Sequence, residues 1–125
     1  MMSLHLLFVY NANSDLFSSV TGFAHKIISP QTYNCSLCLL TYGNLTMKQE
    51  WKSFLAALPA EKTFLHKDEF ESQYKQSFGL PAIFYLKENR PVVLMTSDEI
   101  NRCTSLNELM TGLLQQIQLL ESYPV

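Results

Sequence analysis

Short apolar runs bounded by polar or turn residues recur along the chain and predict buried strands. The runs are rich in Leu, Phe, Val, Ile and Tyr, and we expect strands at residues 4–10, 37–42, 62–66, 81–86 and 92–95. Between the last two, Lys87-Glu88-Asn89-Arg90 indicates a hairpin turn.

Other segments carry helix signals. Apolar residues recur at the 3.6-residue spacing of an amphipathic helix in residues 14–29, 46–58 and 105–120, and acidic residues open a shorter helix at 68–76. Thr46–Gln49 and Ser105–Glu108 have the form of capping boxes. The order β-α-β-α-β-α-β-β-α predicts one α/β domain over residues 1–125, with helices on both faces of a mixed sheet.

Composition and charge narrow the function. Apolar residues make up 47% of the 125 residues and charged residues 16%, which is typical of a globular domain. The net charge of −2 argues against nucleic-acid binding. Neither a Gly-rich phosphate loop nor a Gly-x-Ser-x-Gly elbow occurs, so the sequence argues against the enzyme classes that these two motifs mark.

The N-terminus indicates the compartment. The apolar run at residues 4–10 is far shorter than the about 20 residues that span a bilayer, and it lacks the flanks of a signal peptide. We therefore expect a soluble cytoplasmic protein without membrane association.

The segment Gly79-Leu80-Pro81-Ala82-Ile83-Phe84-Tyr85-Leu86, with the hairpin and helix after it, resembles the thioredoxin family. There a Gly-hydrophobic-Pro sequence precedes a core strand, and the proline is cis and flanks the active site. The resemblance implies a thioredoxin-like three-layer sandwich, a cis Leu80–Pro81 bond and a role for Pro81 beside the site. The chain also loosely resembles small uncharacterised bacterial proteins of that fold, which implies no activity.

The three cysteines are Cys35, Cys38 and Cys103, an odd number that argues against a structural disulfide framework. The Cys35-x-x-Cys38 pair has three interpretations: reversible disulfide exchange, two ligands of a metal ion, or two small packed side chains. Metal binding needs two more ligands, for which His25 and His66 are available, but their spacing matches no common zinc pattern.

The position of the pair departs from the thioredoxin pattern, in which Cys-x-x-Cys follows a central strand. If residues 37–42 are that strand, the pair lies at the opposite end of the sheet from Pro81. If residues 4–10 are that strand, the pair sits in an inserted loop that folds back over Pro81. Both registers remain open at this point.

The remaining candidates carry weaker signals. His66 ends a strand at the edge where ligands bind in such sheets, His25 lies on a solvent face, and His5 is expected to be structural. Asp68, Glu69 and Glu71 are explained by the dipole at a helix start.

The sequence therefore predicts thiol–disulfide exchange or redox sensing with a protein thiol or disulfide as partner. In this interpretation Cys35 is the nucleophile, Cys38 the resolving thiol, and Pro81 shapes the partner groove. The alternative is a non-catalytic binding module that holds a structural metal at Cys35, Cys38 and a histidine.

Overall fold

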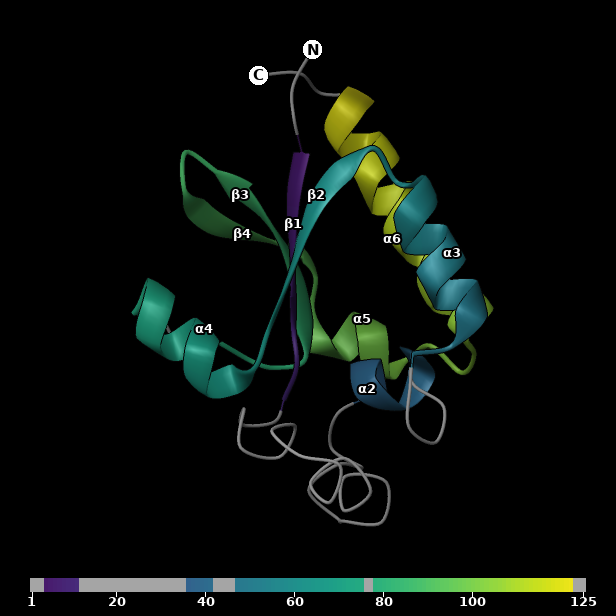
Figure 1. The fold of residues 1–125 in the computed structure, drawn as a ribbon, viewed down its shortest axis with the longest axis horizontal. Helices are drawn as coiled ribbons and strands as arrows, with labels where there is room; N and C mark the ends of the chain where they lie inside the picture. Colours follow the sequence, from purple (N-terminus) through teal and green to yellow (C-terminus); the bar gives the residue numbers. More distant parts are fainter. Residues whose placement is uncertain (1–3, 12–35, 42–46, 76–77, 123–125) are drawn as a thin grey trace.

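A computed structural model describes residues 4–11, 36–41, 47–75 and 78–122 (Figure 1). The described elements are β1 (Leu4–Val9), α2 (Ser36–Thr41), α3 (Gln49–Ala57), β2 (Ala60–Leu65), α4 (Lys67–Tyr74), β3 (Ala82–Lys87), β4 (Arg90–Met95), α5 (Ser97–Asn101) and α6 (Leu106–Ser122). The predicted helix at 14–29 lies outside the described residues.

The described strands form one mixed sheet in the order β2-β1-β3-β4. β1 runs parallel to β2, with Leu4 opposite Ala60, and antiparallel to β3, which pairs antiparallel with β4. Because β1 is central and covered on both faces, four successive residues, Leu6 to Val9, are at most 1% exposed. This explains why its sequence is a nearly continuous apolar run.

Two apolar clusters lie on opposite faces of the sheet. Leu6, Phe8 and Tyr10 belong to a cluster with residues of α2, α3, α5 and α6. Leu7 and Val9 pack with Phe70 of α4. Figure 1 shows α3 and α6 on one face and α4 on the other. The predicted α/β class with helices on both faces of a mixed sheet is therefore confirmed.

The predicted strand at 37–42 is wrong, because Ser36–Thr41 forms α2. The edge of β1 that a second strand would occupy is taken by β2. Leu37 is 1% exposed in the core, and Thr41 Oγ1 donates a hydrogen bond of 2.7 Å to the Leu37 carbonyl one turn earlier. A short apolar run does not distinguish a buried strand from a buried helical turn.

The capping predictions have different outcomes. Ser105 accepts a hydrogen bond of 3.2 Å from Glu108 N, which confirms one bond of the predicted box at the last helix. The Glu108 carboxylate accepts its bond from Thr104 N at 2.7 Å. The predicted box at Thr46–Gln49 is wrong, because the N-cap of α3 is Lys48, which makes no side-chain cap bond.

Helix α5 was not predicted, although its capping box is present in the sequence. Thr96 accepts a hydrogen bond from Glu99 N at 3.2 Å, and the Glu99 carboxylate accepts one from Thr96 N at 2.8 Å.

In the part of the chain that the structure describes, none of the helices is long and apolar enough to cross a membrane.

The predicted hairpin turn joins β3 to β4 through Glu88 and Asn89, which have φ angles of 52° and 65°. Both residues therefore lie in the left-handed region, as in the two-residue turns that favour Asn-Gly. A Glu side chain is strained there because its Cβ approaches the following carbonyl oxygen.

We predict that the double substitution Glu88→Asn, Asn89→Gly raises the free energy of unfolding by about 1 kcal/mol, because Asn-Gly suits this turn. Urea unfolding of the variant and the wild type measures the difference. Glu88→Ala keeps a strained Cβ and serves as the control that gives no gain. A double variant no more stable than the wild type would contradict the turn geometry.

Candidate functional site

Three residues form a row where the central strands end. Val9 pairs with Leu65 of β2 on one side and with Ala82 of β3 on the other. The row consists of the residues next to those three, which are Tyr10, His66 and Pro81. Tyr10 N donates a hydrogen bond of 2.9 Å to the Leu65 carbonyl, which keeps Tyr10 next to the end of β2. Ligands of open α/β sheets bind at this type of strand end.

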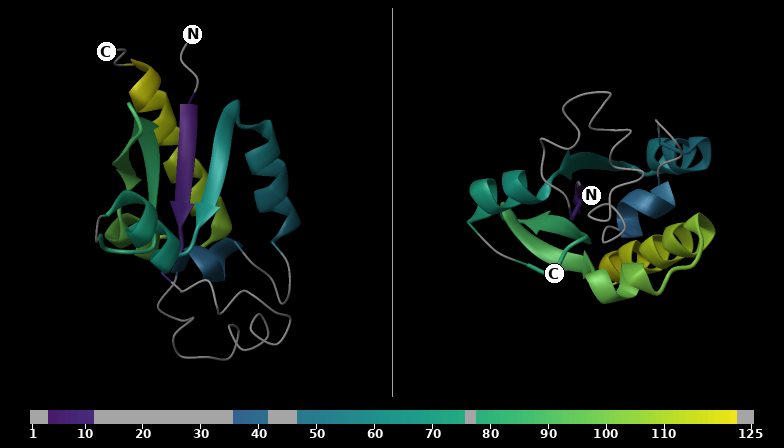
Figure 2. Two further views of the ribbon diagram at one scale, coloured as in Figure 1. Left: turned by 60° about the vertical axis from the view of Figure 1, so that its left-hand side comes forward. Right: turned by 90° about the horizontal axis from the view of Figure 1, so that it is seen from below.

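Helix α2 lies at the same end of the sheet. Figures 1 and 2 show α2 near the C-terminal end of β1, and α5 is in contact with α2. Leu37 of α2 shares a core cluster with Tyr10 and with Ile100 of α5. On its other side α5 meets the segment before Pro81, where a Cβ added at Gly79 would lie 3.3 Å from Ser97 Oγ.

This placement bears on the two registers open from the sequence. Residues 4–9 form the strand beside Pro81, because Val9 pairs with Ala82, and α2, which contains the Cys38 backbone, lies near the same C-terminal end of β1. The backbone of Cys38 is part of α2, and Cys35 directly precedes its first residue in the sequence. The expectation that a strand follows Cys35 is therefore wrong, because a helix follows it. Cys35 and the Cys38 side chain lie outside the described part.

Pro81 is buried, and the Leu80–Pro81 bond is cis. The expected cis bond is confirmed. β3 begins at the next residue, Ala82, which pairs with Val9 of β1. Pro81 thus stands next to the end of the strand that leads toward the cysteine-containing segment.

His66 is the N-cap residue of α4, and Glu69 fixes its ring. One oxygen of Glu69 accepts hydrogen bonds from His66 Nδ1 at 2.7 Å and from His66 N at 2.8 Å. The His66 ring lies 5.9 Å from the Tyr10 ring, centroid to centroid, and its side chain is 21% exposed. The imidazole is thus partly buried and held on two sides.

Glu69 has more than the helix-dipole role expected from its position. The backbone hydrogen bond from His66, followed by the bond from its side chain, lowers the pKa of the Glu69 carboxyl. The link between His66 and Glu69 was not predicted, although three residues is the spacing of a capping box and is visible in the sequence.

Cys103 lies in the connection between α5 and α6 and is half-buried against the core. Burial, followed by the nearby Glu108 and Glu99 carboxylates, raises the pKa of its thiol. Its Sγ donates to the Glu99 carbonyl at 3.5 Å. Cys103 is therefore disfavoured as a thiolate nucleophile at neutral pH.

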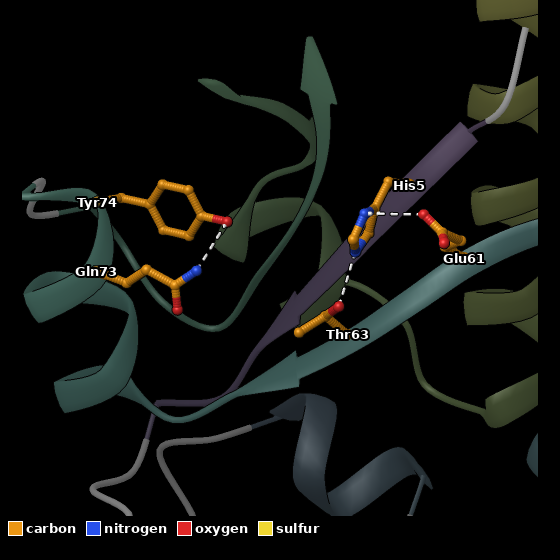
Figure 3. A network of polar contacts seen from close by, with 5 residues as sticks. All are labelled: His5, Glu61, Thr63, Gln73 and Tyr74. Atoms are coloured by element: carbon orange, nitrogen blue, oxygen red, sulfur yellow. Dashed lines mark hydrogen bonds and ion pairs between the residues drawn. The ribbon is translucent and has the colours of Figure 1, made fainter. Parts of the chain in front are cut away.

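His5 lies in β1 at the end remote from Tyr10 (Figure 3). Its Nε2 is 2.7 Å from Thr63 Oγ1, and its Nδ1 is 3.4 Å from a Glu61 oxygen. These bonds join β1 to β2 and support the structural role predicted for His5. Figure 3 also shows Gln73 and Tyr74 of α4, linked to each other at 3.4 Å.

Among the residues that the structure describes, no three His, Cys, Asp or Glu side chains gather as metal ligands. His25 and Cys35, which the metal interpretation uses, lie outside them.

Comparison with protein-family models, curated protein sequences and solved structures gives no significant match.

The packing of α2 generates a stability prediction. Leu37→Ala should lower the free energy of unfolding by about 2–5 kcal/mol, because it leaves a cavity beneath α2. Leu119→Ala in α6 is the matched control, since that side chain is 50% exposed and its loss costs little. Chemical denaturation measures both, and equal effects would contradict the buried position of α2.

The Glu69 contacts generate a pH prediction. Its folded-state pKa is lowered, so its stabilising contribution is full above the unfolded value, about 4.3, and is lost as the pH falls through the folded value. The Glu69 side chain is 45% exposed, so Glu69→Gln should cost only about 0.2–1 kcal/mol at pH 7.

Urea unfolding of Glu69→Gln and the wild type, at pH 7 and at an acidic pH below the folded pKa of Glu69, tests the prediction. The difference in the free energy of unfolding should vanish in acid. Glu71→Gln in the same helix should differ little from the wild type at both pH values. A Glu69→Gln effect independent of pH would contradict a role for the charged carboxylate.

Proposed function

We propose that this chain is a thioredoxin-like domain that carries out thiol–disulfide exchange through Cys35 and Cys38. The observation that carries the proposal is the position of α2. This helix contains Cys38, begins directly after Cys35, and lies at the sheet end where Pro81 flanks β1.

The order of elements supports the thioredoxin-like fold. In the first half, the described helices α2 and α3 lie in the sequence between two parallel strands, β1 and β2. The second half is the antiparallel hairpin of β3 and β4, followed by α6 on the face that α3 also covers. Val9, at the end of β1, pairs with Ala82, the residue after Pro81, and the family resemblance implies that the active site lies beside this proline.

The chemistry assigns a separate role to each thiol. The Cys35 thiolate attacks one sulfur of a partner disulfide, forms a mixed disulfide and releases the first partner thiolate. The Cys38 thiolate then attacks the Cys35 sulfur, closes the Cys35–Cys38 disulfide and releases the second partner thiolate. The protein loses two electrons and the partner gains them.

The proposed partner is a protein disulfide that reaches the sheet end beside Pro81. We place the protein in the cytoplasm, where thiols are kept reduced and a Cys35–Cys38 disulfide is transient. Cys103 takes no part, because burial disfavours its thiolate.

A redox titration tests the proposal. Equilibration with glutathione buffers, alkylation of free thiols and intact-mass measurement should show a reversible two-electron transition between about −180 and −300 mV. Cys35→Ser should abolish it, Cys38→Ser should accumulate a mixed disulfide with glutathione, and Cys103→Ser should leave the midpoint unchanged.

The contrary result is equally specific. If no Cys35–Cys38 disulfide forms at any potential, the exchange function is wrong. One bound zinc ion per chain in that preparation would instead identify a non-catalytic module that uses the pair as metal ligands.

A further inference from the structure

The described sheet ends in two outer strands, β2 and β4, and an outer strand presents unpaired backbone groups to other chains. The outer edge of β4 is interrupted twice. Lys87 and Arg90 flank a two-residue turn and form a hydrogen-bonded pair, so the backbone of Pro91 faces outward and offers no N–H. The pairing with β3 also skips Leu94. A proline and an irregularity of this kind protect an edge against the addition of another strand.

The outer edge of β2 has neither feature. Its residues, Ala60–Leu65, include no Pro or Gly and pair with β1 without a shift. The Leu65 carbonyl accepts the bond from Tyr10 N and so points toward β1, and backbone groups alternate in direction along a strand. The N–H and C=O groups of Lys62 and Phe64 therefore point away from β1. In the described part of the chain, no further strand pairs with them.

The side chains beside this edge are compatible with a second strand. Phe64 stacks on Phe8 with 4.8 Å between ring centroids but is only partly buried, so some of its apolar surface is left to cover. Lysines often protect such edges, but Lys62 Nζ donates to the Leu58 carbonyl at 3.0 Å, and this bond holds the charge on its own chain. A strand added here gains main-chain hydrogen bonds and covers Phe64.

Symmetry and charge identify a second copy of this chain as the strand that fits. When two copies of β2 pair antiparallel about a two-fold axis, outward-facing residues lie opposite each other, and the axis passes at Lys62 or at Thr63 if most of the strand is to pair. An axis at Lys62 sets two lysines directly opposite, which is destabilising. An axis at Thr63 sets Thr63 opposite Thr63, a favourable pair, and Lys62 opposite Phe64.

The register with its axis at Thr63 also brings opposite charges together. Glu61 of one copy lies opposite Leu65 of the other, and its diagonal neighbour is Lys67. The intervening residue, His66, has extended backbone angles and so continues the direction of the strand to Lys67. The Glu61 and Lys67 side chains are both exposed, and symmetry forms their pair twice.

We propose that this chain forms a homodimer in which the β2 strands of two copies pair antiparallel about a two-fold axis at Thr63. Lys62 of each copy and Phe64 of the other exchange both N–H···O=C bonds, and the two sheets become one continuous sheet. Because the paired strands run in opposite directions, the Pro81 ends of the two copies lie at opposite ends of that sheet. The dimer therefore does not depend on the proposed function.

Sedimentation equilibrium over a range of concentrations tests the dimer, with a thiol reductant present to exclude disulfide-linked chains. The wild type should approach twice the chain mass of 14.3 kDa. Lys62→Pro removes the outward N–H and leaves the bonds to β1, so the dissociation constant should rise at least about tenfold. Lys62→Ala keeps the N–H and is the matched control that retains the dimer.

A second variant decides the question if Lys62→Pro does not fold. Thr63→Lys sets two ammonium groups opposite each other at the axis and should also dissociate the dimer, whereas Thr63→Val should retain it. Far-UV circular dichroism and urea unfolding establish that each variant is folded.

Amide hydrogen exchange tests the register within the wild type. The Lys62 and Phe64 amides should be protected in the dimer and exchange rapidly in dilute solution, while the Thr63 amide, which is bonded to β1, should be protected in both.

Two results would overturn the proposal. One is a wild type that keeps the mass of a single chain at every concentration. The other is a dimer that both Lys62→Pro and Thr63→Lys leave intact, because its interface then lies elsewhere on the molecule.

Discussion

The double burial of β1 is the constraint on which the rest of the structure depends. Leu6, Leu7, Phe8 and Val9 are all at most 1% exposed, so each face of this strand needs its own apolar cover. α4 supplies it on one face, and α2, α3, α5 and α6 share the other. With β2 and β3 hydrogen-bonded to its two edges, β1 brings the residues that follow β2 and precede β3 to one place. The row of His66, Tyr10 and Pro81 follows from that pairing.

Helix α2 connects this row to the cysteine pair. A single turn of α2 packs against the core. In this turn Leu37 is buried, and Thr41 Oγ1 donates a hydrogen bond to the Leu37 carbonyl. The Lys48 N–H donates to the Thr41 carbonyl at 2.8 Å, which ties the end of α2 to the start of α3. Partial burial, followed by the nearby Glu108 and Glu99 carboxylates, raises the pKa of the Cys103 thiol. Half-buried Cys103 is thus disfavoured as the reacting thiol.

Apart from α5, the C-terminal half could be predicted from the sequence because its signals are local. The turn at Glu88 and Asn89 joins two adjacent apolar runs, and the apolar residues of α6 keep the helical period over several turns. The run at Leu37 to Leu40 is too short to show a period. Its helical form is decided by tertiary contacts with α5 and α6, to which no local pattern refers.

The residues of the candidate site likewise divide into those that a local pattern indicates and those that only the tertiary structure brings together. Pro81 and the cysteine pair were recognised from motifs, and His66 was noticed because it ends a strand. Its bond with Glu69 follows the spacing of a capping box and was predictable in principle. The meeting of His66 and Pro81 at Tyr10 was not, because it depends on β1 lying between β2 and β3, and a sequence pattern does not specify strand order.

The most direct test of the central claim is a comparison of backbone amide NMR spectra of the reduced and oxidised protein in a Cys103→Ser background. The claim is that the Cys35–Cys38 pair operates at the end of β1, between His66 and Pro81. Oxidation should then shift the amide signals of Tyr10, His66 and Ala82 together with those of α2, while the signal of His5 stays in place. Shifts confined to the neighbours of the two cysteines in the sequence, with Tyr10, His66 and Ala82 unmoved, would contradict it.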